Sequence, residues 1–263
     1  MATTFLCGYV HKHPFRSNHI KGQLPRLFAN VEVVNLANNS FFGPISTFLC
    51  QKMSKINKLK VLDVSNSFLF GELSNYWKSL VELKSLSLQD NSFYGDISLS
   101  LKMCSKLELI DIGDNHFLET IPLWIAKVIE LIVLCLRSSR FKGNVPLHIC
   151  QISSLRILDL ANNILSGSIS SCLKNINAKV MPNSKNEDVY FDALEYEYDY
   201  ESYIDNLMLA PKGHELENED NLKFMKMIDL LGNKLFGSIL VEIFVLFELT
   251  FLNLSRNHLM ANI

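Results

Sequence analysis

The chain has 263 residues, of which 48% are hydrophobic and 20% are charged. This composition supplies enough apolar material for a core and excludes a chain that is disordered throughout. The formal net charge of −2 argues against a dedicated nucleic-acid binder, which normally carries a basic excess on one face. No stretch reaches the roughly 20 apolar residues of a membrane helix, so we expect no membrane span in this chain.

Residues 1–14 show the repeat described below only weakly. They also lack the basic start and sustained apolar region of a clear signal peptide. Cys7, His11 and His13 lie close together here, but the six cysteines of the chain include no CxxC pair and no zinc-ligand spacing. We therefore expect no metal ion and no cofactor.

From Phe15 onward one sequence pattern recurs. It has apolar residues at the first, fourth and sixth places, followed by asparagine, a further apolar residue and glycine. Residues 31–45 and 83–97 share the whole frame. The last apolar residue of each strand marks the series Phe15, Leu36, Val64, Leu88, Ile112, Leu136, Leu160, Leu230 and Leu254. Successive markers are 21, 28, 24, 24, 24, 24, 70 and 24 residues apart. Four equal steps in a row indicate stacked coils, each of which covers its neighbour's apolar face.

Each unit should begin with a short strand whose first, fourth and sixth residues point into the coil while the others point outward. Stacked strands then pair as a parallel sheet. The sequence predicts an α/β solenoid, a right-handed superhelix of about nine coils, as many as there are markers. We expect the sheet on its concave side and short helical turns on its convex side, where Trp77 and Trp124 should be packing residues.

The asparagine after each strand has a mechanical role. Its amide offers donors and an acceptor to backbone groups left open where the chain turns away from the sheet. Ser67 and Ser139 replace it in two units, where fewer hydrogen bonds can form, and Glu119 replaces the usual glycine in another. The predicted ladder consists of Asn39, Asn91, Asn115, Asn163, Asn233 and Asn257.

Outward strand positions supply the candidate binding residues. The place just before the marker holds Asp63, Asp111, Asp159 and Asp229, with Asn35 and Asn253 in the same row. Paired carboxylates can act as acid and base, but these should lie on separate coils, facing solvent, without a nucleophile. We therefore expect no enzyme and no catalytic residue. The preferred interpretation is a concave ligand surface that includes Asp63, Ser87, Gln89, Asp111 and Arg137.

The 70-residue step contains 46 residues more than one repeat, and a loop of this length in a regular array is functional or disordered. The predicted organisation is therefore repeats over 15–176, an insertion over 177–221 and repeats over 222–263. Between Glu187 and Asp220 the insertion holds twelve acidic residues and one basic residue, a charge of −11. Five of the eight tyrosines also lie in it, a composition suited to protein recognition, with a solvated acidic loop as the alternative.

For two features, the cysteines and the glycosylation sequons, the sequence allows two interpretations each. Cys150 and Cys172 occupy related places on adjacent coils and form either a disulfide or two packed thiols, whereas Cys104 should lie in the interior. Glycosylation sequons begin at Asn38 and Asn253, but both arise inside the repeat spelling, so chance is a fair alternative.

The string N-x-F/L-x-G-x-I-P resembles the plant-specific leucine-rich repeat of receptor kinases and receptor-like proteins. Residues 155–169 and 247–263 look like the ectodomain end of receptor-like proteins of the xylanase-receptor and apple scab-resistance type. The resemblance implies that the insertion is an island domain, in which Tyr203 and the pair Lys212-Gly213 match a spacing implicated in co-receptor contact. It further implies an extracellular position at the plasma membrane, a protein or peptide ligand, and recruitment of a co-receptor kinase in defence signalling.

Departures from the family pattern lead to two alternatives. The proline of the motif survives only as Pro25, Pro122 and Pro146, and the chain stops at Ile263 inside a repeat, without terminal caps, membrane helix or kinase domain. The chain is thus expected to be a fragment of a longer ectodomain. A soluble leucine-rich-repeat inhibitor of a secreted hydrolase is one alternative, although those inhibitors resemble uninterrupted arrays, and a nonfunctional remnant is the other.

Overall fold

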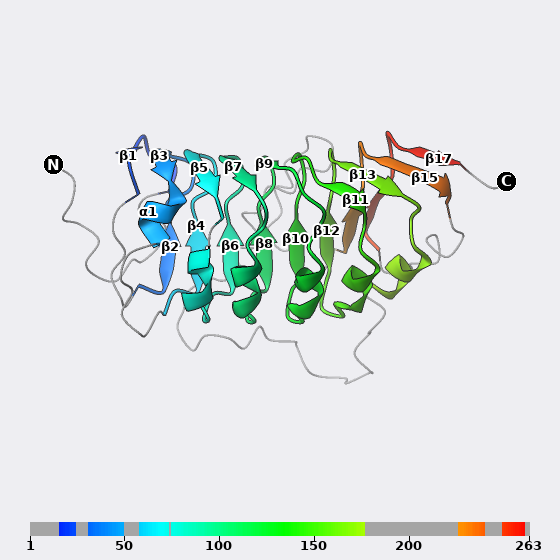
Figure 1. Ribbon diagram of the computed structural model, residues 1–263, viewed down its shortest axis with the longest axis horizontal. Helices are drawn as coiled ribbons and strands as arrows, with labels where there is room; N and C mark the ends of the chain where they lie inside the picture. Colours follow the sequence, from blue (N-terminus) through cyan, green and yellow to red (C-terminus); the bar gives the residue numbers. More distant parts are fainter. Residues whose placement is uncertain are drawn as a thin grey trace.

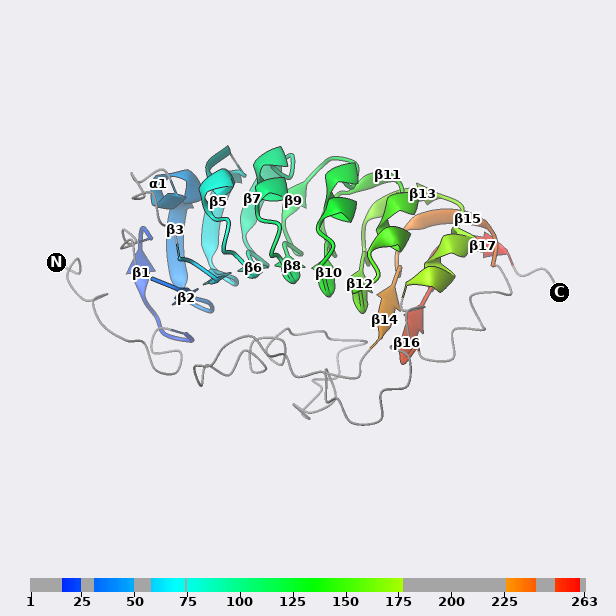
Figure 2. The ribbon, with the colours of Figure 1, turned by 90° about the horizontal axis from the view of Figure 1, so that it is seen from below.

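The computed structural model describes residues 16–24, 31–49, 58–73, 75–176, 226–239 and 249–260. These residues form a stack of coils, each with an inner strand followed by an outer strand and, in most coils, a short helical turn (Figure 1). Seen from below, the stack is an arch with the inner strands on its concave side and the helical turns on its convex side (Figure 2). The predicted solenoid with a concave parallel sheet is confirmed.

The inner strands form one eight-stranded parallel sheet in the order β16-β14-β12-β10-β8-β6-β4-β2. They are β2 (Val33–Asn35), β4 (Val61–Asp63), β6 (Ser85–Ser87), β8 (Leu109–Asp111), β10 (Val133–Cys135), β12 (Ile157–Asp159), β14 (Met227–Asp229) and β16 (Phe251–Asn253). Strand β12 pairs directly with β14, so the 70-residue step interrupts the sequence but not the sheet. Since every pairing is unshifted, a given place in the repeat forms a straight row across the sheet.

The outer strands form two separate parallel sheets. The first contains β1 (Lys21–Gly22), β3 (Ser40–Pro44), β5 (Phe68–Glu72), β7 (Ser92–Gly95) and β9 (His116–Phe117), and the second contains β11 (Lys142–Asn144), β13 (Ile164–Gly167), β15 (Lys234–Ser238) and β17 (His258–Met260). Between β9 and β11 the regular pairing is reduced to the isolated bridge Thr120 to Lys142, where the amides of Arg140 and Lys142 donate to the carbonyls of Phe117 and Glu119.

Glu119 explains this break. The repeat glycine has φ +81° at Gly95 and +77° at Gly143, a region that side chains disfavour. Glu119 stands at the same place between them without a positive φ, and its carboxylate accepts a hydrogen bond from the amide of Ile97. The substitution seen in the sequence therefore divides the outer surface in two.

The helical turns line the convex side. They are α1 (Ile45–Leu49) and the 3₁₀ turns η1 (Asn75–Ser79), η2 (Leu99–Met103), η3 (Leu123–Lys127), η4 (Leu147–Gln151) and η5 (Ser171–Asn175). Trp77 and Trp124 are buried there, as predicted. Cys150 of η4 and Cys172 of η5 form a disulfide, which decides the alternative left open by the sequence. Closing a loop of this size stabilises a chain by roughly 2–4 kcal/mol.

The core runs through the whole stack. Leu88, Ile112, Leu136 and Leu160, the markers of four successive coils, are all 0% exposed. Cys104 is buried as well, as predicted. Because each coil supplies one thin layer of apolar side chains, its stability depends on the coils on either side.

The asparagine ladder joins one coil to the next. Asn115 accepts a hydrogen bond from the amide of Phe93 in the preceding coil, at 2.9 Å, and donates to the carbonyl of Leu88 there, at 3.0 Å. It also donates to the carbonyls of Ile112 and Gly113 in its own coil. The same four kinds of bond recur at Asn163, Asn233 and Asn257. The ladder thus has the predicted mechanical role.

Candidate ligand-binding surface on the inner sheet

Outward side chains of the inner sheet form two rows across the strands. The row just before the markers, here called the carboxylate row, contains Asn35, Asp63, Ser87, Asp111, Cys135, Asp159, Asp229 and Asn253. Two residues earlier in each strand lies a second row, here called the apolar row, with Val33, Val61, Ser85, Leu109, Val133, Ile157, Met227 and Phe251. The fold thus brings the predicted aspartates together along one line.

Most members of the carboxylate row hold the turn that follows their own strand. In Asp111 one carboxylate oxygen accepts a hydrogen bond from the amide of Gly113, at 3.1 Å. The same bond to the second residue onward is made by Asn35, Asp63, Asp159, Asp229 and Asn253. Short aspartate and asparagine side chains favour such local turns. Sequence reasoning missed this role, although aspartate or asparagine at six of eight places was the available signal.

The expectation that this row faces solvent is wrong for most of its members. Asp111 is 3% exposed, Asp159 is 0% and Asp229 is 4%, whereas Asp63 is half-buried. Bending the side chain back onto the following turn places its oxygens against the sheet instead of in water. Asp111 lies in the predicted row, but its carboxylate is largely withdrawn from the surface.

Burial perturbs the acidity of these groups. It raises the pKa of Asp111 to about 7, an effect that the Gly113 amide opposes and the neighbouring carboxylates of Asp159 and Asp63 reinforce. Burial also raises the pKa of Asp159 to about 6, against the opposing charge of Arg137. Burial likewise raises the pKa values of Asp63 and Asp229. Near neutral pH the row is therefore less negative than its sequence indicates.

We predict that the folded chain becomes more stable as the pH falls from 8 to 5. The ordinary pKa of an aspartate is 3.8, so between about pH 4 and 7 the folded state keeps a proton on Asp111 that the unfolded state has lost. Raising the pH through this window therefore removes stability. Asp111→Asn keeps an acceptor for Gly113 and should reduce the difference in unfolding free energy between pH 5 and pH 8 by about 2 kcal/mol.

Urea unfolding at both pH values measures this effect. Glu130→Gln removes a carboxyl group from an exposed residue and should leave the pH dependence as it is in the unaltered chain. An Asp111→Asn variant with an unchanged pH dependence would contradict the burial explanation.

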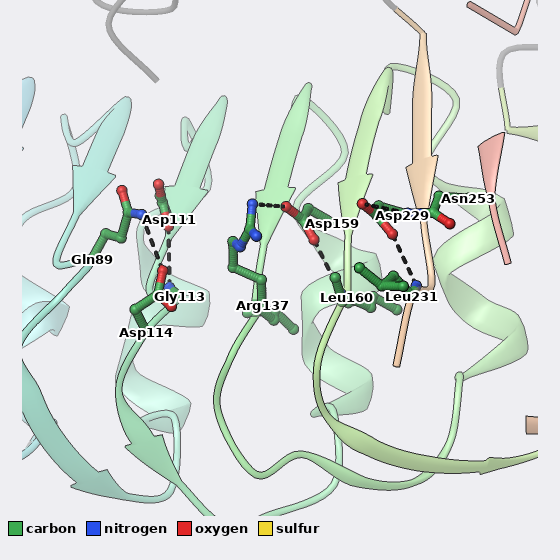
Figure 3. A network of polar contacts seen from close by, with 12 residues as sticks. Gln89, Asp111, Gly113, Asp114, Arg137, Asp159, Leu160, Asp229, Leu231 and Asn253 are labelled. Carbon is green, nitrogen blue, oxygen red and sulfur yellow. Dashed lines mark hydrogen bonds and ion pairs between the residues drawn. The ribbon is translucent and has the colours of Figure 1, made fainter. Parts of the chain in front are cut away.

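Polar side chains near the row are partly accessible and linked in pairs. Gln89 donates a hydrogen bond to Asp114 at 3.2 Å, and Arg137 forms an ion pair with Asp159 at 3.3 Å (Figure 3). The Arg137 side chain is 20% exposed while its partner is fully buried. Gln89 and Arg137 lie on coils separated by the coil of β8, and each presents a hydrogen-bonding group held in a fixed position.

The apolar row was not anticipated. A cluster separate from the main core lies on the concave face of the inner sheet. It contains Leu109, Val133, Cys135, Ile157 and Met227. The signal was available, since seven of the eight places in this row are apolar. The five side chains of this cluster are at most 2% exposed, so they stabilise the concave face of the sheet and present little apolar surface to a ligand.

The predicted co-receptor residues Tyr203, Lys212 and Gly213 lie outside the described residues, as does the insertion. Asn38 is half-buried and accepts a hydrogen bond from Asn66, whereas Asn253 is 6% exposed, which disfavours modification of the folded chain there. Within the described ranges, no helix is long and apolar enough to cross a membrane, and no cluster of metal-ligating side chains is present.

Comparison with known proteins identifies the class of the fold. The sequence profile of the Leucine Rich Repeat family matches residues 154–176, a single repeat, and no curated protein sequence matches the chain. The chain is a leucine-rich-repeat solenoid, and its fold is similar to the ectodomains of plant membrane receptors.

Three solved structures illustrate the likeness. A TDR receptor has a TM-score of 0.66 and 23% identity, over 92% of this chain and 34% of its own. The Arabidopsis receptor kinase HAESA, in complex with the peptide hormone IDA and the co-receptor SERK1, has a TM-score of 0.63 and 24% identity, over 92% of this chain and 33% of its own. The ectodomain of GASSHO1/SCHENGEN3 from Arabidopsis thaliana, in complex with CASPARIAN STRIP INTEGRITY FACTOR 2, has a TM-score of 0.64 and 22% identity, over 93% of this chain and 27% of its own. The chain spans about a third of the length of these structures or less.

Proposed function

We propose that the chain is part of the ectodomain of a plant cell-surface receptor and that its inner sheet binds a peptide or protein ligand. The observation that carries the proposal is the sheet of eight strands in unshifted register, with partly accessible side chains that the fold itself does not require. The similar fold of HAESA, solved in complex with the peptide hormone IDA, supports it. An enzymatic function finds no support in the buried, turn-holding carboxylates.

Rigidity is what suits this surface to recognition. The outward side chains belong to coils whose strands pair with the strands of neighbouring coils, and the asparagine ladder joins the same coils. Binding then costs little conformational entropy beyond that of the side chains and the ligand. We expect direct ligand contacts from Asp63, Ser87, Gln89 and Arg137, which are half-buried, while Asp111 acts chiefly by holding its turn.

A display library of random linear peptides, selected against the purified chain, tests this proposal. Selected peptides should lose at least about tenfold in affinity, or roughly 1.4 kcal/mol, when Gln89 and Arg137 are both replaced by alanine. The matched control is Lys102→Ala with Lys127→Ala, exposed residues of the convex turns η2 and η3. Absence of enrichment, or equal binding to both double variants, would count against a concave binding site.

Recruitment of a co-receptor kinase, in defence signalling at the plasma membrane, is the second part of the proposal. It rests on the resemblance at Tyr203, Lys212 and Gly213, where lysine offers a charge-assisted bond and tyrosine an amphipathic ring. In a complete receptor, Tyr203→Ala with Lys212→Glu should reduce co-receptor recovery after ligand treatment and spare ligand capture. Tyr190→Ala with Lys185→Glu, equal changes in the same insertion, provides the control. Unchanged recovery with the first pair would exclude this role.

A further inference from the structure

Exposed aromatic residues line the face of the first outer sheet. Phe42, Phe68, Phe70 and Tyr94 are 43%, 66%, 45% and 48% exposed. Along each strand they alternate with buried residues such as Phe41, which face the core. The repeat prescribes only the buried places, so the aromatic residues are not needed to form the coil.

The strand register gathers these rings into one patch. Phe42 pairs with Phe68 in register, and Tyr94 pairs with Glu72 on the strand beside it. Leu118, 53% exposed, extends the patch just beyond β9. The four aromatic residues come from the adjacent strands β3, β5 and β7, which lie about 4.8 Å apart along the edge of the solenoid that carries the outer strands (Figure 1). In register, Phe70 lies beside Ser92, and Tyr94 lies between Glu72 and His116.

Charge divides this outer surface into two unlike halves at the break caused by Glu119. The half formed by β3 to β9, here called the acidic half, carries Glu72 and Asp96 at the ends of β5 and β7, and Asp90 and Asp114 in the turns before β7 and β9. His116 and, in the adjoining strand β1, Lys21 are its basic groups. The half formed by β11 to β17, here called the basic half, carries exposed Arg140, Lys142, Lys234, Arg256 and His258. Apolar residues occur in the basic half too, namely Ile164, Phe236 and Met260.

We infer that this surface binds a second copy of the chain in an antiparallel, two-fold arrangement. In such a dimer the acidic half of each copy faces the basic half of the other, and apolar residues meet apolar residues in both places. The acidic and the basic half lie on the same surface of one chain. A second copy of the chain can therefore match both halves, whereas a partner of a single charge sign can match only one of them.

The available apolar area is adequate for such a contact. From their exposed fractions, the eight apolar side chains of the two halves present on the order of 800 Å². Stable interfaces bury roughly 800 Å² per partner. Exposed apolar patches of this extent on soluble proteins commonly mark interaction sites.

A charge exchange between two variants provides the decisive test, with sedimentation over a concentration series as the measurement. The unaltered chain should show reversible dimers. Glu72→Lys with Asp96→Lys removes the net negative charge of the acidic half, and Arg140→Glu with Lys142→Glu removes the net positive charge of the basic half. Each double variant alone should dimerise at least about tenfold more weakly, and an equimolar mixture of the two should form heterodimers.

Controls separate this inference from a folding defect and from the proposed ligand site. All four replaced residues are exposed, so circular dichroism and melting should be unchanged. Lys102→Glu with Lys127→Glu alters charge equally on the convex side and should leave the dimer intact. Peptides bound by the inner sheet should bind all variants alike. A chain that stays monomeric at every concentration, or a mixture that fails to associate, overturns the inference.

Discussion

Replacing Leu136 by aspartate is expected to unfold the coils around it. Leu136 is 0% exposed and lies in the core between the markers of the neighbouring coils, Ile112 and Leu160. An unpaired carboxylate at this place must lose its hydration or force the coil open, at a cost of several kcal/mol. That cost is of the order of the whole stability of a domain, about 5–15 kcal/mol. Circular dichroism and urea unfolding should show loss of the cooperative transition.

Leu147→Asp is the matched control for this change. Leu147 begins the convex turn η4 and is 62% exposed, so the same substitution should alter stability by no more than about 0.5 kcal/mol. A Leu136→Asp chain as stable as Leu147→Asp would be incompatible with the interior position of the marker residues.

Periodicity made the coil predictable from the sequence. The inward places are set by a pattern repeated at equal steps, and one misassigned residue would have conflicted with every other coil. The markers, the asparagine ladder and the convex tryptophans follow from this consistency. The direct pairing of β12 with β14 follows as well, because the same frame resumes at Leu230 after the long step.

The environment of the outward aspartates was harder to predict. Alternation along a strand gives the side of the sheet on which Asp111 lies, but not the side-chain torsion that turns its carboxylate toward the Gly113 amide. Burial then follows from contacts between neighbouring coils, which one repeat does not reveal. Ligand contacts are less predictable still, because a partner and not the repeat selects the residues at places such as Gln89.

On the outer surface, a single departure from the repeat pattern changes how the strands pair. The sequence shows glutamate at the place of a glycine, but only the structure shows that Glu119 breaks the outer sheet between β9 and β11. The exposed aromatic places are variable in the repeat and therefore carry no structural signal. They became interpretable once the strand register showed Phe42 beside Phe68.

Replacing Asn115 by alanine is expected to cost about 3–4 kcal/mol of unfolding free energy. Asn115 is 3% exposed and makes four hydrogen bonds to backbone groups of two coils. Alanine leaves the amide of Phe93 without this acceptor and the carbonyl of Ile112 without this donor where water has little access, while the carbonyl of Leu88 keeps its bond from Asn91. Each buried backbone group left unpaired costs roughly 1–3 kcal/mol. Urea unfolding of the variant measures the loss.

Asn257 allows burial to be separated from the number of hydrogen bonds. It makes the same four kinds of bond, at 2.8–3.3 Å, but lies in the last described coil and is only partly buried. Water can replace its amide there, so Asn257→Ala should cost about 1 kcal/mol. Equal losses at the two positions would show that the ladder acts through local turn geometry alone. A clear excess at Asn115 would show that it acts by satisfying backbone groups that the stacked coils have removed from water.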